Sequence, residues 1–189
     1  MGRVQRADAR RNYDLLVEAA ADAFARDGIE TSLEGIARQA GVGIGTLYRH
    51  FPSRDCLVEA VFRHNVAQLT QAADELLSTL PPGQALAEWM RRFVSYVSTK
   101  KGLATHLKTV VSANSDLFVS SHQQVDAAIR KLVEAAVASG DIRDDVDAMD
   151  LLRALSGVCL VDAPGWQDQA CRITGLLMDG LRYRAHALA

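Results

Sequence analysis

Apolar residues recur at helical spacing along almost the whole chain, and no stretch alternates apolar and polar residues as a strand does. Only four prolines interrupt the pattern. The fold class that it predicts is all-α, with about nine helices. Their expected extents are about residues 9–27, 34–40, 44–50, 54–78, 86–102, 103–111, 117–138, 148–158 and 166–186.

Capping residues mark where several of these helices begin. Thr31 and Glu34 form a T-x-x-E capping box before the second expected helix. Ser53 and Asp147 are expected to be the N-caps of the fourth and eighth helices, because their side-chain oxygens can accept hydrogen bonds from the first backbone N–H groups.

The clearest break in the chain is Pro81-Pro82-Gly83, which interrupts helical periodicity. It divides the chain into a small N-terminal domain with three helices at residues 1–52, a connecting helix at 53–80 and a larger helical domain at 81–189.

Composition is that of a globular protein, with 49% hydrophobic and 23% charged residues. The three cysteines are an odd number without CxxC spacing, which argues against a disulfide framework and a cysteine zinc site. Neither a signal peptide nor an apolar run of membrane-spanning length is visible in the sequence. We therefore expect an intracellular, cytoplasmic protein that does not span a membrane.

The formal net charge of −2 gives no hint of a polyanionic partner, but it averages over all faces of the protein. Residues 1–64 hold nine basic and nine acidic residues. Between Arg38 and Arg54, however, there are three arginines and no acidic residue. The first eleven residues carry four arginines against Asp8 alone. These two positive segments favour contact with phosphate groups.

Two short helices joined by a glycine-containing turn are typical of a helix-turn-helix, whose second helix enters the major groove of DNA. Residues 31–62 read TSLEGIARQAGVGIGTLYRHFPSRDCLVEAVF. Over residues 10–64 the chain resembles the DNA-binding domain of the tetracycline-repressor (TetR) family of bacterial regulators. The matching positions are Phe24, Gly28, Ile36, Ala37, Gly41, Val42, Thr46, Leu47, Tyr48, His50, Phe51, Ser53 and Arg54.

The resemblance implies a DNA-contacting surface around the second and third helices. Its candidate residues are Thr31, Ser32, Arg38, Ile44, Gly45, Thr46, Tyr48, Arg49, His50 and Arg54. Thr46 offers a hydroxyl group and a methyl group, whereas Tyr48, His50 and Arg54 are expected to reach phosphate. Alternatively, Tyr48 packs in the core and His50 is a surface residue without a role. The N-terminal arginines form either a solvated tail or an arm that enters the minor groove.

The two last expected helices contain Gly157, Gly175 and Gly180, each of which costs about 1 kcal/mol relative to alanine in a helix. Glycines in such positions permit close helix approach. The resemblance implies a homodimer formed through these helices, and the candidate interface is Leu155, Gly157, Val158, Ile173, Leu176, Leu177, Gly180 and Leu181. Alternatively, the glycines pack within one subunit.

The resemblance also implies a small apolar or amphipathic effector bound among the fifth to eighth helices. The candidate ligand-contacting residues are Trp89, Phe93, Tyr96, His106, Val110, Phe118, His122 and Cys159. Aromatic residues at helical spacing are equally typical of an ordinary core, which is the alternative for the aromatic candidates, whereas His106 and His122 are alternatively surface residues.

We thus expect a DNA-binding transcriptional regulator, a repressor that binds a pseudo-palindromic operator in double-stranded DNA as a dimer and is released by its effector. Two alternatives are a DNA-binding protein whose larger domain binds a protein partner, and a helical enzyme. The five histidines have no metal-ligand spacing, and neither GxSxG nor a phosphate-binding glycine loop occurs. We therefore expect no metal, no cofactor and no enzymatic activity.

Overall fold

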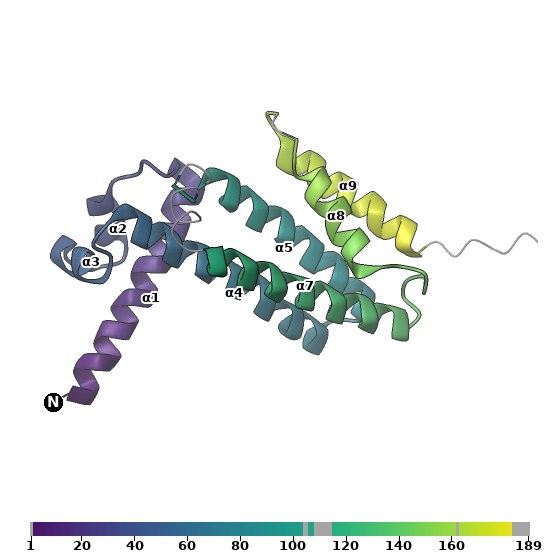
Figure 1. Ribbon diagram of the computed structural model, residues 1–189, viewed down its shortest axis with the longest axis horizontal. Helices are drawn as coiled ribbons and strands as arrows, with labels where there is room; N and C mark the ends of the chain where they lie inside the picture. Colours follow the sequence, from purple (N-terminus) through teal and green to yellow (C-terminus); the bar gives the residue numbers. More distant parts are fainter. Residues whose placement is uncertain (1, 104–105, 108–114, 162, 183–189) are drawn as a thin grey trace, which may run out of the picture. The chain divides into compact units, whose positions relative to one another are not determined.

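A computed structural model describes residues 2–103, 106–107, 115–161 and 163–182, with the backbone alone for residues 2–6 and 115. Throughout these ranges every regular element is a helix (Figure 1), which confirms the all-α fold class. The helices are α1 (Gly2–Asp27), α2 (Leu33–Gln39), α3 (Ile44–His50), α4 (Arg54–Thr79), α5 (Pro82–Gly102), α7 (Ser115–Ala138), α8 (Ala148–Val158) and α9 (Trp166–Arg182).

Two expected helix starts are wrong. Helix α1 begins at Gly2 instead of near residue 9, so the arginine-rich N-terminal stretch continues the first helix. Helix α5 begins at Pro82, because a proline in the first turn needs no backbone N–H and has a φ suited to a helix. Most of the short helix expected at 103–111 lies outside the described residues, although His106 and Leu107 are helical.

The chain divides into two compact units, each with its own core. The first unit consists of Met1–Asn65 and Thr99–Phe118, and the second of Val66–Ser98 and Val119–Ala189. Helices α4 and α5 each contribute to both units. The first unit therefore combines the expected DNA-binding domain with a segment that follows it by more than thirty residues in the sequence.

The turn between α2 and α3 depends on Gly41. Its φ of +70° lies in the left-handed region, where a side chain is strained. The backbone N–H of Gly41 donates to the carbonyl of Arg38, and that of Val42 donates to the carbonyl of Ala37, at 3.1 and 3.0 Å. These bonds close the end of α2 and start the approach to α3. Leu47 of α3 is fully buried, so the inner face of this helix is anchored in the core of the first unit.

The core of the second unit joins α5, α7, α8 and α9 with the second half of α4. Trp89 is fully buried at its centre, and its Nε1–H donates to the carbonyl of Leu69 at 2.8 Å. Figure 1 shows α8 and α9 side by side. Among the described helices, none combines the length and the apolar character that a membrane span requires.

Candidate functional site

The start of α2 differs from the expected capping box. The N-cap is Ser32, whose Oγ accepts a hydrogen bond from the backbone N–H of Gly35 at 3.2 Å, and Thr31 lies one residue before it. Glu34 contacts the Ser32 hydroxyl at 2.9 Å. A hydrogen bond from its own backbone N–H, followed by that from Ser32, lowers the pKa of the Glu34 carboxyl. The assignment of Thr31 as the cap is therefore wrong.

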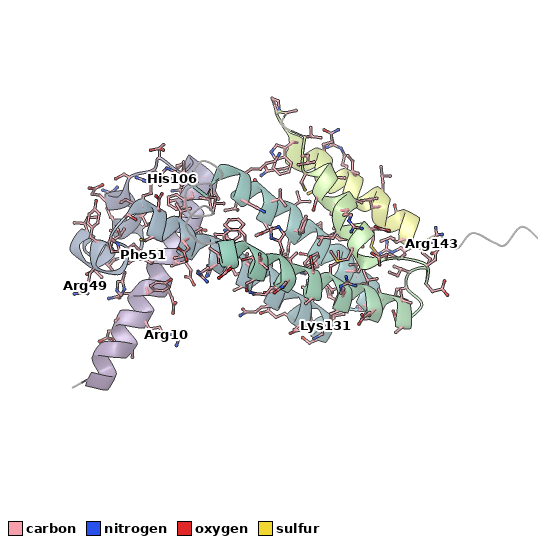
Figure 2. All side chains as sticks on the ribbon, in the orientation of Figure 1. Arg10, Arg49, Phe51, His106, Lys131 and Arg143 are labelled. Atoms are coloured by element: carbon pink, nitrogen blue, oxygen red, sulfur yellow. The ribbon has the colours of Figure 1, made fainter. Side chains whose placement is uncertain are left out.

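Helix α3 presents its outer face to solvent. Tyr48 is 46% exposed, which disfavours the alternative that it packs in the core. Arg49 is exposed and points outward from α3, whereas Phe51 is buried (Figure 2). Ile44 and Thr46 are half-buried. This face therefore offers a hydroxyl group, a phenol and a guanidinium group at one surface.

Glycines leave room beside these side chains. A Cβ atom built on Gly43 or Gly45 would meet no described atom within 4 Å. Packing inside the protein therefore does not require glycine at either position. The open space is what a close approach of the α3 backbone to a groove wall would use.

His50 lies closer to the core than expected. Its ring meets Tyr13 edge-on with centroids 6.1 Å apart, and it lies beside Phe51. Its Nε2 is buried and has no hydrogen-bond partner among the described residues. Burial also raises the pKa of the Tyr13 hydroxyl. A phosphate contact by Nε2 would thus require this ring to turn.

Arg54 is engaged inside the first unit. Its Nη1 donates to the backbone carbonyls of Ile29 and of Thr31, the latter at 2.9 Å. Both acceptors lie in the loop that joins α1 to α2. Arg54 therefore fixes this loop to the start of α4, whatever further contact its remaining N–H groups make with DNA.

A polar hollow of about 440 Å³ opens between the end of α1 and α2. It brings together Thr31, Ser32 and Arg38 from the expected DNA-contacting set. Arg26 also lines it and is paired with Asp27 at 2.8 Å. Three of the expected residues, from the start and the last turn of α2, thus line one hollow.

His106 is held by two carboxylates of the first unit. Its Nδ1 lies 2.7 Å from Oδ1 of Asp55, and its Nε2 lies 3.6 Å from Oε1 of Glu30. Phe118 is also in the first unit, where it stacks on Phe62 with centroids 4.9 Å apart. These two candidates for effector binding therefore belong to the unit that contains the helix-turn-helix.

The other candidates for effector binding lie in the second unit or outside the described residues. Trp89 is fully buried with its N–H satisfied, and Cys159 is buried against Val94 and Ala170, which favours the core alternative for both. Phe93 packs between Trp89 and the half-buried Tyr96. Val110 lies outside the described residues.

The polar groups among these candidates are Tyr96 and His122. Burial raises the pKa of the Tyr96 hydroxyl to about 12, so it is a neutral donor at physiological pH. His122 is exposed on α7. A neutral phenol beside Phe93 suits an amphipathic molecule better than an ionic one.

Helices α8 and α9 share an open apolar face. Leu176 of α9 is 70% exposed, and Leu160, which follows the end of α8, is 79% exposed. A Cβ atom on Gly157, Gly175 or Gly180 would meet no described atom within 4 Å. These glycines therefore do not serve packing within one subunit, contrary to the alternative drawn from the sequence.

One residue of the expected dimer interface belongs elsewhere. Leu155 is fully buried in the core of its own unit, because it lies on the opposite side of α8 from the open face, so its assignment to the interface is wrong. The remaining interface candidates are half-buried or exposed, and Leu176, Leu177, Gly180 and Leu181 line a shallow groove of about 480 Å³ between α8 and α9.

Three of the four acidic residues between α7 and α8 have a structural role. The carboxylate of Asp141 accepts a hydrogen bond from the N–H of Gly83 at 2.7 Å, in the first turn of α5. Asp145 pairs with Arg143. Asp147 caps α8, as expected, by accepting from the N–H groups of Met149 and Asp150. Within the described residues no group of three or more side chains is arranged to hold a metal ion.

Comparison with known proteins agrees with this arrangement. Residues 16–61 match the family described as bacterial regulatory proteins, tetR family, and residues 81–183 match the transcriptional regulator SbtR-like C-terminal domain. The HTH-type transcriptional regulator SAUSA300_2515 of Staphylococcus aureus is 30% identical over 93 residues, which are 47% of this chain. The matched residues cover 50% of that relative, so the chain spans about half of its length.

Solved structures extend the similarity over almost the whole chain. The TetR transcriptional regulator SCO0520 from Streptomyces coelicolor is 42% identical, covers 92% of this chain and 99% of its own, and superimposes with a TM-score of 0.83. A TetR transcription regulatory protein from Mycobacterium vanbaalenii is 35% identical over 95% of this chain and 99% of its own, with a TM-score of 0.76. Given the helix-turn-helix geometry and these matches to both parts of the chain, the protein belongs to the TetR family of transcriptional regulators.

Proposed function

We propose that the protein is a repressor that binds a pseudo-palindromic operator as a homodimer and is released by a small apolar or amphipathic effector. The observation that carries this proposal is the outer face of α3, where Tyr48 and Arg49 are exposed in a stretch of the chain without acidic residues. This face supports DNA binding. The open face of α8 and α9 supports dimerisation, and the aromatic side chains of the second unit support release of the operator by an effector.

The proposed contacts to DNA are of two chemical kinds, contacts to phosphate and contacts to base edges. Arg49 supplies charge for phosphate, whereas Arg38 and Thr46 supply a guanidinium group, a hydroxyl group and a methyl group for base edges. Ile44 and Gly45 carry no polar side-chain group for a base edge. Sequence discrimination therefore rests on Arg38, Thr46 and the arginines of α1 more than on the start of α3.

Dimerisation is supported by the open glycines and by the exposed Leu176 on the same face. A two-fold interface presents each residue twice, so this face would be covered by its own copy. The two recognition helices would then reach half-sites one helical turn apart, about 10 base pairs.

Release by an effector is a population shift. A ligand that binds more tightly to one arrangement of the two recognition helices draws the dimer into that arrangement. If this arrangement does not match successive major grooves, the operator is released. Phe93 and Tyr96 supply an apolar wall and a neutral hydroxyl for such a ligand.

A selection from a library of random-sequence DNA duplexes tests the proposal. The wild-type chain is expected to enrich two inverted half-sites with centres about 10 base pairs apart. Thr46→Ala should alter the enriched bases, because Thr46 is proposed to read a base edge. A reporter gene placed behind the enriched duplex should be repressed by the protein. Enrichment of no common sequence, or of single unpaired sites, contradicts the proposal.

A further inference from the structure

His106 reaches the helix-turn-helix unit from outside it in sequence. It follows α5, yet its Nδ1 lies 2.7 Å from the carboxylate of Asp55 in the first turn of α4. A carboxylate only accepts hydrogen bonds, so the ring carries its proton on Nδ1 and donates it to Asp55. With 25% of its side chain exposed, His106 is largely enclosed at this contact.

The other side of the same ring faces the loop between α1 and α2. The Nε2 of His106 lies 3.6 Å from the carboxylate of Glu30, whose side chain is 83% exposed. The imidazole therefore stands between a residue of α4 and a residue of the loop.

Arg54 holds the same loop from the neighbouring position. It donates to the carbonyls of Ile29 and Thr31, the residues on either side of Glu30. Three successive loop residues are thus held by two cationic or proton-donating side chains. Arg54 and Asp55 are adjacent at the start of α4. The hydrogen bonds of Arg54 and the contact of His106 with Asp55 therefore connect the loop to the same point of that helix.

The loop decides where α2 lies. It runs from Gly28, with a φ of +81°, to Ser32, the N-cap of α2. Five residues between two helices leave little slack, so a shift of the loop displaces the start of α2. Helix α2 packs on α3, and the DNA-reading surface is shared between them.

We propose that His106 is a positioning residue for DNA binding. Together with Arg54 it forms a clamp on residues 29–31, which keeps α2 and α3 in the arrangement that fits the groove. This proposal rests on the proposed function for its DNA readout. It assigns to His106 a contact within the first unit and not a contact with the effector.

Two variants at His106 separate the hydrogen bond from the volume of the ring. His106→Leu keeps much of the volume and removes both nitrogens, whereas His106→Asn places an amide N–H near the position of Nδ1. For the duplex enriched by the wild-type protein, we expect His106→Leu to raise the Kd about tenfold, which corresponds to about 1.4 kcal/mol. His106→Asn should stay within about threefold of wild type.

The salt dependence of binding distinguishes positioning from phosphate contact. Because His106 touches no phosphate in this proposal, His106→Leu should leave the slope of log K against log salt unchanged. Amide hydrogen exchange of the free protein should become faster at residues 29–36 in His106→Leu and remain as in wild type in His106→Asn. The thermal midpoint, followed by circular dichroism, checks that the variants fold.

Glu30→Gln is the second test, because an exposed side chain can be changed without unfolding the unit. It should change the Kd about two- to threefold in wild type and have no effect in His106→Leu, since the contact that it alters is absent there. Wild-type affinity together with wild-type exchange at residues 29–36 in His106→Leu overturns the clamp. If the wild-type protein enriches no duplex, the proposed function fails, and the exchange measurements alone decide the clamp.

Discussion

Replacing Leu176 with alanine is expected to weaken the homodimer about 300-fold. The change removes three carbon atoms, and burial is worth about 0.8 kcal/mol for each. Because 70% of the side chain is exposed in one subunit, covering it in the dimer contributes about 1.7 kcal/mol. A two-fold interface contains the residue twice, so the dimer is destabilised by about 3.4 kcal/mol, which is a factor of about 300 in Kd.

Sedimentation equilibrium over a dilution series measures this Kd directly. Val119→Ala is the matched control, because Val119 is also exposed, at 58%, in the second unit but lies on α7. It should leave the Kd unchanged. A Leu176→Ala dimer that dissociates within about threefold of wild type would refute the assignment of this face, and a comparable weakening in the control would show that the effect is not specific to α8 and α9.

Three further predictions concern DNA binding, packing and capping. Arg49→Ala should reduce the salt slope of operator binding by about 1.8, because the slope changes by about 0.9 for each phosphate neutralised and a dimer carries Arg49 twice; an unchanged slope would exclude the phosphate assignment. Gly83→Ala should lower the free energy of unfolding in urea by about 1–3 kcal/mol, because the new Cβ would lie 2.7 Å from the Cβ of Asp141. The control Gly35→Ala, where the nearest atom is 3.7 Å away, should be neutral or stabilising. Hydrogen bonds from the N–H groups of Asp150 and Met149 lower the pKa of the Asp147 carboxyl. Its contribution to stability is therefore present above the unfolded pKa of 3.8 and disappears as the pH falls through the lower folded value. Asp147→Asn should thus be less stable than wild type at pH 7 and equal to it at strongly acidic pH, and a constant difference would contradict this.

Local signals in the sequence were sufficient for most helices and for two of the predicted caps, Ser53, whose Oγ accepts from the N–H of Cys56 at 3.2 Å, and Asp147. Apolar spacing and helix-ending glycines depend on neighbours within a few residues, and so does the capping of α8 by Asp147. The start of α2 was harder, because Thr31 and Ser32 can both cap a helix. Ser32 does so in the structure, while Arg54 binds the carbonyl of Thr31 from 23 residues away.

The candidate sites likewise combine features that the sequence shows with features that only packing decides. The acid-free stretch between Arg38 and Arg54 and the resemblance to a family were visible in the sequence, and the exposure of Tyr48 agrees with that interpretation. The sequence does not show which apolar residues of α8 and α9 are exposed to solvent. Leu155 and Leu176 have the same side chain on amphipathic helices, and only the packing of the second unit makes one fully buried and the other 70% exposed.

By itself the sequence determined the helical class, the helix-turn-helix and the positive charge of its outer face, because each of these depends on residue types at short, regular spacing. Only the tertiary structure decided the partners of His106 and Arg54. His106 meets Asp55 across 51 residues of sequence, and Arg54 meets Ile29 across 25. Contacts over such separations depend on how whole helices pack, which no local pattern of residues records.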